Sequence, residues 1–257
     1  MEMRRENTPR GPVFTLTHED GRSVVVHIQS LGQDNAMSKA IAGLTARLSD
    51  FTGVVNSADA QFKAGARAEQ LRGGVANVVS KAFAATQIDG RKEGQQIATA
   101  RATALSVDPA TPATAYIRQN FLAHWNAANI GQKGDLVAIA TVEELSAVIE
   151  TKSYQGLPVE FQKTILDDFI LKRHINRTGL QSEFSLQPDH EFPLRTGPNV
   201  EAAMAASRDA LNRLNARSDT IANVNNTLLG LIDLVALATD QHRNQAYDLL
   251  VNSNIAA

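Results

Sequence analysis

The sequence predicts a mainly α-helical protein in which an N-terminal β-hairpin precedes a helical bundle with long heptad-patterned helices. Three observations lead to this prediction. Alanine makes up about 15% of the 257 residues and aromatic residues only 5%, and alanine has the highest intrinsic helix propensity. Apolar residues recur at alternating spacings of three and four over long stretches, as on one face of a helix. β-Branched residues flank a turn signal only near the N-terminus.

The composition also excludes several classes of protein. Hydrophobic residues make up 43% of the chain, charged residues 20%, and the formal net charge is −2. Such a chain can bury a core, and its overall charge does not attract nucleic acid or acidic lipid. It has no cysteine, which excludes a disulfide framework, a thiolate zinc site, an iron–sulfur cluster and a cysteine nucleophile.

The hairpin is predicted over residues 13–17 and 23–28. Asp20-Gly21 lies between them, and a two-residue type I′ turn favours this pair because both of its central positions need positive φ. In that register Leu16 faces Val25, and both faces of the hairpin are substantially apolar. A lone hairpin is marginal in water, so we expect helices or another subunit to cover it. The expected contact residues are Phe14, Leu16, Val24, Val26 and Ile28.

Helical periodicity begins after Gly32. One apolar stripe alternates spacings of four and three, although Gly53 weakens its middle. A second stripe follows a break near Gly65, and a further helix is predicted over residues 95–105. The first stripe contains Met37, Ile41, Leu44, Leu48, Phe51, Val55, Ala58 and Phe62, and the second Leu71, Val75, Val78 and Ala82.

Residues 108–179 are predicted to form a compact helical core. Pro112 suits the first position of a helix that ends before Gly131. Thr141 and Glu144 have the spacing of a capping box, which marks the start of a second helix. A third helix is expected from Pro158 to Gly179.

An extended connector over residues 180–198 separates this core from a last helical region. Its three prolines, Pro188, Pro193 and Pro198, disfavour regular structure, and we interpret it as a linker or as an arm on a neighbour. The whole division is residues 1–32, 33–107, 108–179, 180–198 and 199–257.

For the last region, the spacing of apolar residues predicts about forty consecutive helical residues, or a bent helix pair around Gly230. Polar Ser218 and Asn225 fall within its apolar stripe, where a polar residue would specify register or oligomeric state. This stripe is the second predicted protein contact, with Leu211, Leu214, Ile221, Asn225, Leu228 and Ile232.

The sequence offers little chemistry for catalysis. The six histidines lack the spacing that places two imidazoles on one metal. The acid pairs Glu143-Glu144 and Asp167-Asp168 suit a helix start and a polar helix face. There is no nucleophile elbow, phosphate-binding loop or dinucleotide fingerprint. We therefore predict no enzyme, with no catalytic, cofactor-binding or metal residue and no cofactor.

The most apolar run, residues 228–238, is too short to span a bilayer and contains Asp233. We expect no membrane span, and we expect Asp233 to pair with an arginine from another helix or subunit. The N-terminus has no apolar segment behind Arg4 and Arg5, so it is not a secretory signal. The expected location is the cytoplasm, or a virion or other particle assembled there.

The function that fits these features is a non-enzymatic structural or assembly protein that packs against copies of itself and other subunits. A virion component, such as a capsid, connector, tail or internal protein, is the form that the composition favours.

A nucleic-acid-binding or regulatory protein is the alternative. Ile130-Gly131-Gln132-Lys133-Gly134 resembles the Gly-x-x-Gly loop of KH RNA-binding domains, which implies contact with a nucleic-acid backbone. The basic N-terminal arm, with Arg4, Arg5 and Arg10, could add phosphate contacts. A helix end followed by a turn is the simpler interpretation of the glycine pair.

Overall fold

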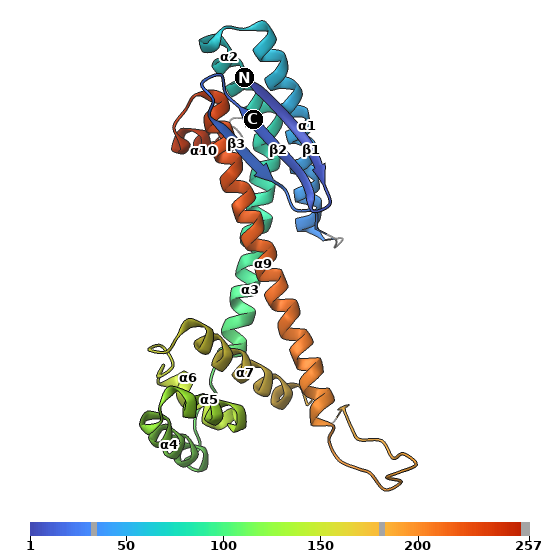
Figure 1. The fold of residues 1–257 in the computed structure, drawn as a ribbon, viewed down its shortest axis with the longest axis vertical. Helices are drawn as coiled ribbons and strands as arrows, with labels where there is room; N and C mark the ends of the chain where they lie inside the picture. Colours follow the sequence, from blue (N-terminus) through green and yellow to red (C-terminus); the bar gives the residue numbers. More distant parts are fainter. Residues whose placement is uncertain (32–34, 180–182, 253–257) are drawn as a thin grey trace. The chain divides into compact units, whose positions relative to one another are not determined.

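The computed structural model describes residues 1–31, 35–179 and 183–252 and confirms a mainly α-helical fold with an N-terminal antiparallel sheet (Figure 1). The strands are β1 (Glu2–Thr8), β2 (Gly11–Thr17) and β3 (Ser23–His27). The helices are α1 (Ala36–Gln61), α2 (Ala64–Gly74), the π-helical turn η1 (Val75–Val79), α3 (Ser80–Leu105), α4 (Pro112–Ala127), α5 (Ile130–Ile139), α6 (Val142–Glu150), α7 (Val159–Thr178), α9 (Val200–Thr239) and α10 (Arg243–Asn252).

Contacts divide the chain into two units. The sheet unit contains Met1–Gln96 and Ser218–Ala257, and the helical unit contains Ile97–Arg217. Helices α3 and α9 each contribute to both units. This grouping differs from the five consecutive segments of the sequence prediction, because the second half of α9 returns to the core of the N-terminal sheet.

The hairpin forms, but the predicted register is wrong by one residue. Phe14 pairs with Val26, and Leu16 with Val24. The loop has three residues, since the His18 N–H donates to the Arg22 carbonyl at 2.8 Å. The Gly21 N–H donates to the His18 carbonyl at 3.0 Å, with Gly21 at φ 87°. A three-residue loop with a left-handed residue at its end is a common alternative to the type I′ turn.

This register separates the two faces of the sheet, because a one-residue shift moves every side chain to the opposite face. Phe14, Leu16 and Val26 share one face and are at most 2% exposed, whereas Val25 lies on the other face and is 60% exposed. The prediction that both faces are apolar is therefore wrong, and so is the need for a cover on each side.

Residues 2–8, predicted as a basic arm, form the edge strand β1. It pairs with β2 from Glu2 opposite Thr17 to Thr8 opposite Gly11. Gly11 has φ 128°, and a Cβ there would lie 2.1 Å from the Ile28 carbonyl oxygen. The outer edge is tied to α1, since the Met3 N–H donates to Asn56 Oδ1 at 2.9 Å and Asn56 Nδ2 donates to the Met3 carbonyl at 3.0 Å.

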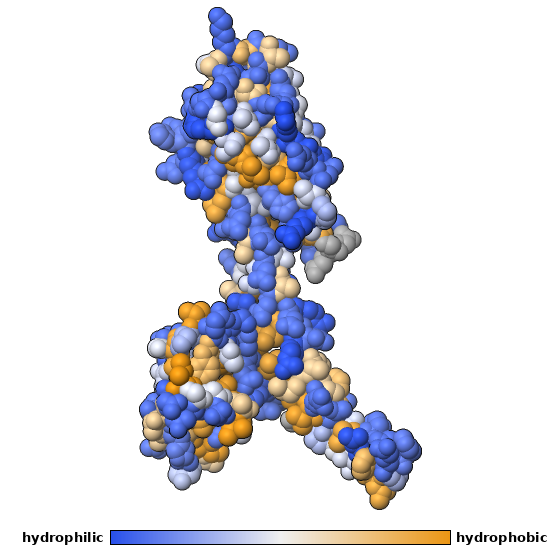
Figure 2. Space-filling model, viewed as in Figure 1, coloured by the Kyte–Doolittle hydropathy of each residue, from blue (hydrophilic) through white to orange (hydrophobic). Residues whose placement is uncertain are grey.

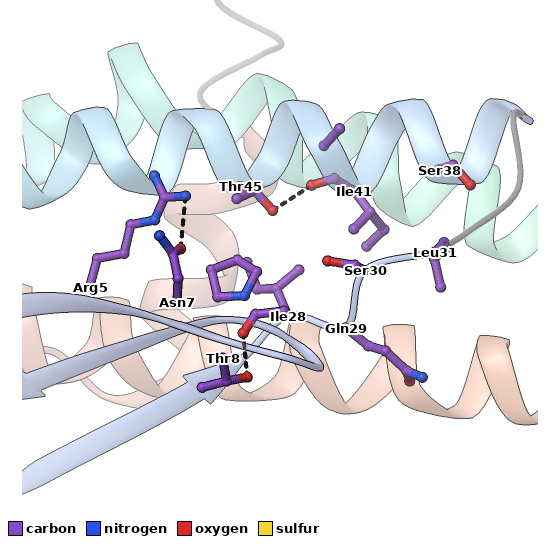
Figure 3. Close-up of a pocket in the computed structure, with 13 residues that line it drawn as sticks. Arg5, Asn7, Thr8, Ile28, Gln29, Ser30, Leu31, Ser38, Ile41 and Thr45 are labelled. Carbon is purple, nitrogen blue, oxygen red and sulfur yellow. Dashed lines mark hydrogen bonds between the residues drawn. The ribbon is translucent and has the colours of Figure 1, made fainter.

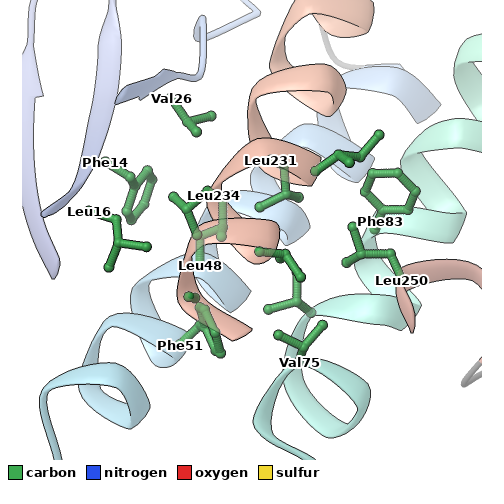
Figure 4. Packing of buried hydrophobic residues seen from close by; sticks show 14 of the residues in the cluster. Phe14, Leu16, Val26, Leu48, Phe51, Val75, Phe83, Leu231, Leu234 and Leu250 are labelled. Carbon is green, nitrogen blue, oxygen red and sulfur yellow. The ribbon is translucent and has the colours of Figure 1, made fainter. Parts of the chain in front are cut away.

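The core of the sheet unit lies between the apolar face of the sheet and its helices. In Figure 4, Phe14 and Leu16 point toward Leu48 of α1 and Leu234 of α9. The first predicted stripe is confirmed from Met37 to Ala58, because all seven of its members in α1 are buried.

The second stripe changes phase at η1. Leu71 and Val75 are buried as predicted, but the next fully buried apolar residues are Val79 and Phe83 rather than Val78 and Ala82. A π-helical turn contains more residues per turn than an α-helix, so the buried face moves along by one residue. The Ser80 hydroxyl donates to the Val75 carbonyl at 3.0 Å within this turn.

The helical unit has its own core and confirms the predicted helix starts at Pro112, Thr141 and Pro158. Thr111, Asn129 and Thr141 each form a capping box with the residue three positions later. Gly131 and Gly134 lie inside α5, so the prediction that they end a helix is wrong: the Asn129 cap starts a new one there. The buried core residues are Phe121, Trp125, Val137, Ala140, Leu145, Val148, Ile165 and Phe169.

Candidate protein-interaction surface

The predicted contact residues of the hairpin belong to the core of the sheet unit. Phe14, Leu16, Val26 and Ile28 are at most 2% exposed, and Val24 is half-buried against them. Their own chain covers them, so they offer no surface to a partner. The expectation of a partner arose from the wrong hairpin register, which divided these side chains between two faces.

The predicted stripe on α9 is also mostly covered by the chain itself. Leu211 and Ile232 are each 8% exposed, and Leu214, Ile221 and Leu228 are half-buried. Asn225 is exposed, and its neighbour Val224 is buried instead. The predicted polar position in the stripe is therefore wrong by one residue, although α9 is the single 40-residue helix that the sequence indicated.

Asp233 pairs with an arginine of another helix, as predicted. Its Oδ1 lies 2.9 Å from Arg243 Nε of α10, and both side chains are partly exposed rather than buried. Helix α9 also contains an 18-residue window with a mean hydropathy of 1.5, long and apolar enough to cross a membrane, and 44% of that window is buried within the protein. Core helices of soluble proteins meet the same criterion.

Exposed apolar side chains are concentrated in the helical unit. Among the described residues, eight of the thirteen large hydrophobic side chains with high exposure belong to it. Figure 2 shows apolar surface in orange over its helices and at the end of the loop before α9. These residues are Tyr116, Ile117, Ile130, Ile139, Val159, Phe192, Leu194 and Val200. The sequence prediction assigned none of them to a contact.

Residues 183–199 form a folded-back loop, which we call the proline loop. This loop contains the described part of the predicted connector, residues 183–198; residues 180–182 lie outside the described residues. Ser185 and Pro198 form an antiparallel bridge, and the Leu186 N–H donates to the Gly197 carbonyl at 2.8 Å. The two ends of the loop therefore lie together, and its middle projects as a tip.

The tip has a defined local structure. The Asp189 carboxylate accepts hydrogen bonds from the backbone N–H of Glu191 at 2.9 Å and of Phe192 at 2.7 Å. The Phe192 N–H in particular lowers the pKa of Asp189. The Arg195 guanidinium lies over the Phe192 ring, 5.9 Å from its centroid. Phe192 and Leu194 remain 58% and 88% exposed.

A shallow groove of about 430 Å³ lies between α4 and α5, and we call it the α4/α5 groove. Ala127, Ala128, Leu136 and Ile139 give it an apolar lining, and Ile139 is 80% exposed. Its polar residues are His124, Gln132 and Asp135. Asp135 has no ion pair within the parts of the chain that the structure describes.

A larger hollow of about 530 Å³ lies between the sheet and α1 (Figure 3). Its polar groups mostly bond to one another: Arg5 Nη2 donates to Asn7 Oδ1 at 3.3 Å, and the Thr45 hydroxyl donates to the Ile41 carbonyl at 2.9 Å. The Ser38 hydroxyl is buried without a hydrogen-bond partner.

Buried arginines form ion-pair networks inside each unit. In the sheet unit, buried Arg67 of α2 pairs with Glu19 of the hairpin loop and with Asp59 of α1 at 2.6 Å. The hydrogen bond from Arg67 lowers the pKa of Glu19. The pKa of Asp59 is lowered mainly by a hydrogen bond from the Met1 ammonium at 2.8 Å.

In the helical unit, Arg173 of α7 binds the end of α3. Its Nη1 donates to the Thr103 carbonyl at 3.2 Å and the Ala104 carbonyl at 3.1 Å, and its Nη2 lies 3.1 Å from Asp108. Arg177 lies 2.7 Å from the same carboxylate, and its hydrogen bond is the main cause of the lowered pKa of Asp108. Both networks have a structural role.

No family model, curated protein or solved structure matches this chain.

The features behind the nucleic-acid alternative have other places in the fold. The Gly131–Gly134 segment belongs to the first half of α5 and is not a loop. Arg4 lies on β1 with its Nε 2.6 Å from Glu2, and Arg5 donates to the Ser49 hydroxyl at 2.7 Å. The resemblance to the KH loop therefore lacks its structural context. Over residues 1–31, 35–179 and 183–252, no group of three or more histidines and carboxylates is placed to hold a metal ion.

Proposed function

We propose that the protein is a structural or assembly protein that acts by packing against copies of itself and other subunits, without catalysis. The observation that carries this proposal is the concentration of exposed apolar side chains in the helical unit. Exposed apolar side chains that lie together mark sites of interaction, and in this unit Phe192 lies with Leu194, and Ile139 with Leu136.

The helical unit does not need these side chains for its own stability. It already buries a core around Trp125, Ile165 and Phe169, each fully covered. Ile139 and Val159 lie outside that core and are 80% and 78% exposed. When a partner covers such a side chain, the complex is stabilised by about 25 cal/mol per Å² of apolar surface that is buried.

A particle such as a virion is the assembly that the alanine-rich, cysteine-free composition favours. The proposal for the surface does not depend on that choice, since any repetitive assembly would use the same apolar side chains.

Size-exclusion chromatography with light scattering tests the proposal. We expect a mass that rises with concentration above the 27.7 kDa of one chain. Replacing Ile139 and Val159 with serine should lower that mass, because both side chains are exposed and outside the core. The matched control is Val25→Ser, which removes a 60% exposed apolar side chain from the sheet unit. A mass of one chain at every concentration would contradict self-association.

A further inference from the structure

We propose that the tip of the proline loop of one copy docks in the α4/α5 groove of a second copy. This inference rests on the proposed function and names the partner and the contact. It commits to one occupant of the groove, the segment around Phe192 and Leu194.

The tip has the properties of an anchor. Phe192 and Leu194 are exposed. Pro193 lies between them, and its ring fixes its own backbone φ. The Asp189 carboxylate accepts a hydrogen bond from the Phe192 N–H, and the Arg195 guanidinium lies over the Phe192 ring. A segment that is ordered before it binds loses less conformational entropy on binding. Aromatic anchors with a neighbouring arginine are enriched among the residues that dominate interfaces.

The groove has the complementary chemistry. Its lining is mainly aliphatic, and a side chain such as Phe192 or Leu194 would cover Leu136 and Ile139. Asp135 supplies one carboxylate without an ion pair among the described residues. Arg195 is the cation of the tip, and its 3.4 Å contact with Asp189 leaves the side chain 46% exposed. Complementary charges of this kind select the partner and its orientation.

A second copy is favoured because one chain carries both halves of the contact. The residues that line the groove include none of the proline loop, so a chain does not fill its own groove. A tip that enters the groove of another copy leaves one groove free on its own chain. Such contacts either close reciprocally in a dimer or continue through further copies.

Disulfide trapping tests this contact cleanly because the natural chain has no cysteine. A mixture of the single variants Leu194→Cys and Ile139→Cys, oxidised mildly, should give a cross-linked pair. Trypsin should then release a disulfide-linked product that joins residues 178–195 to residues 134–152. Since each variant has only one cysteine, this product can form only between two copies. The matched control mixes Leu194→Cys with Val25→Cys, which is exposed but lies on the sheet.

Charge reversal gives a second measurement. Arg195→Asp in the Leu194→Cys chain, or Asp135→Arg in the Ile139→Cys chain, should each lower the yield of the 139–194 cross-link severalfold, and both changes together, one in each chain, should restore it. Both side chains are exposed, so neither change should unfold the protein.

The outcomes separate the two proposals. An oligomer that forms without the 139–194 cross-link overturns the inference and leaves the proposed function intact. A wild-type protein that stays a single chain at every concentration overturns both. Equal yields in the test and control mixtures would mean random collision and would also overturn the inference.

Discussion

Gly73 and Gly74 are neighbours in the sequence, but a side chain at each would meet different surroundings. A Cβ at Gly73 has nothing within 4 Å, whereas a Cβ at Gly74 would lie 2.9 Å from Val54 Cγ1 on α1. Alanine is favoured over glycine inside a helix by about 1 kcal/mol. We expect Gly73→Ala to raise the free energy of unfolding by about that amount. Gly74→Ala should lower the free energy of unfolding, because Val54 must move to admit the added Cβ. Urea unfolding of the two variants measures the difference, and an equal gain in both would contradict the packing at this position.

Single residues also show where sequence reasoning was accurate. The caps at Thr141 and Gly179 were predictable because each depends on local chemistry, a side-chain oxygen at one end and a left-handed residue at the other. The buried positions Val79 and Val224 were missed by one residue. A regular heptad spacing was assumed through both regions, and the π-helical turn η1 interrupts it before Val79. No residue in that turn marks the change of phase in advance.

At the scale of elements, the hairpin shows how one turn decides a larger interpretation. Asp20-Gly21 correctly marked the turn, but the loop includes Glu19 as well, and the register moved by one residue. The predicted register divided the apolar side chains between two faces, and this division led to the expectation of a partner on the sheet. Strand β1 was missed because its charged residues are unusual in a strand; it is stable as an edge strand because Met3 reaches the core and Asn56 binds its backbone.

The observed turn predicts a specific requirement at Gly21. Its φ of 87° is costly for any residue with a Cβ, by about 1 kcal/mol. Gly21→Ala should therefore lower the free energy of unfolding, and Gly21→Asn should lower it less, because asparagine tolerates left-handed φ. Gly43→Ala, at an open position on α1, is the control and should be stabilising. Chemical denaturation measures all three. An alanine variant as stable as the wild type would contradict the three-residue loop.

At the scale of the whole molecule, the sequence predicted the helical class but not the candidate surface. The apolar residues predicted to contact a partner are largely covered by their own chain, as Phe14, Leu211 and Ile232 show. The surface instead uses Ile139 and Leu194, which lie at a helix end and in a loop. Neither residue belongs to a periodic apolar pattern, so only the structure shows that both side chains are exposed.

Each unit has its own core and its own ion-pair network, and this arrangement predicts how acid destabilises the protein. The pKa of Glu19 and of Asp59 is lowered in the sheet unit, and the pKa of Asp108 is lowered in the helical unit. A lowered pKa in the folded state adds stability above the ordinary values of 4.5 for Glu19 and 3.8 for the two aspartates. That stability is lost as the pH falls below them.

Trp125 is the sole tryptophan and lies in the core of the helical unit, so its fluorescence reports on that unit. We expect the thermal midpoint followed by Trp125 to fall as the pH is lowered from 5 to about 3. Asp108→Asn should lower the midpoint at pH 7 and reduce its dependence on pH, because the asparagine cannot titrate. Arg67→Gln, in the sheet unit, should leave the pH dependence of the fluorescence midpoint unchanged and reduce that of far-ultraviolet circular dichroism. If Asp108→Asn kept the full acid dependence of the wild type, the pairing of Asp108 with Arg173 and Arg177 would not be a source of stability.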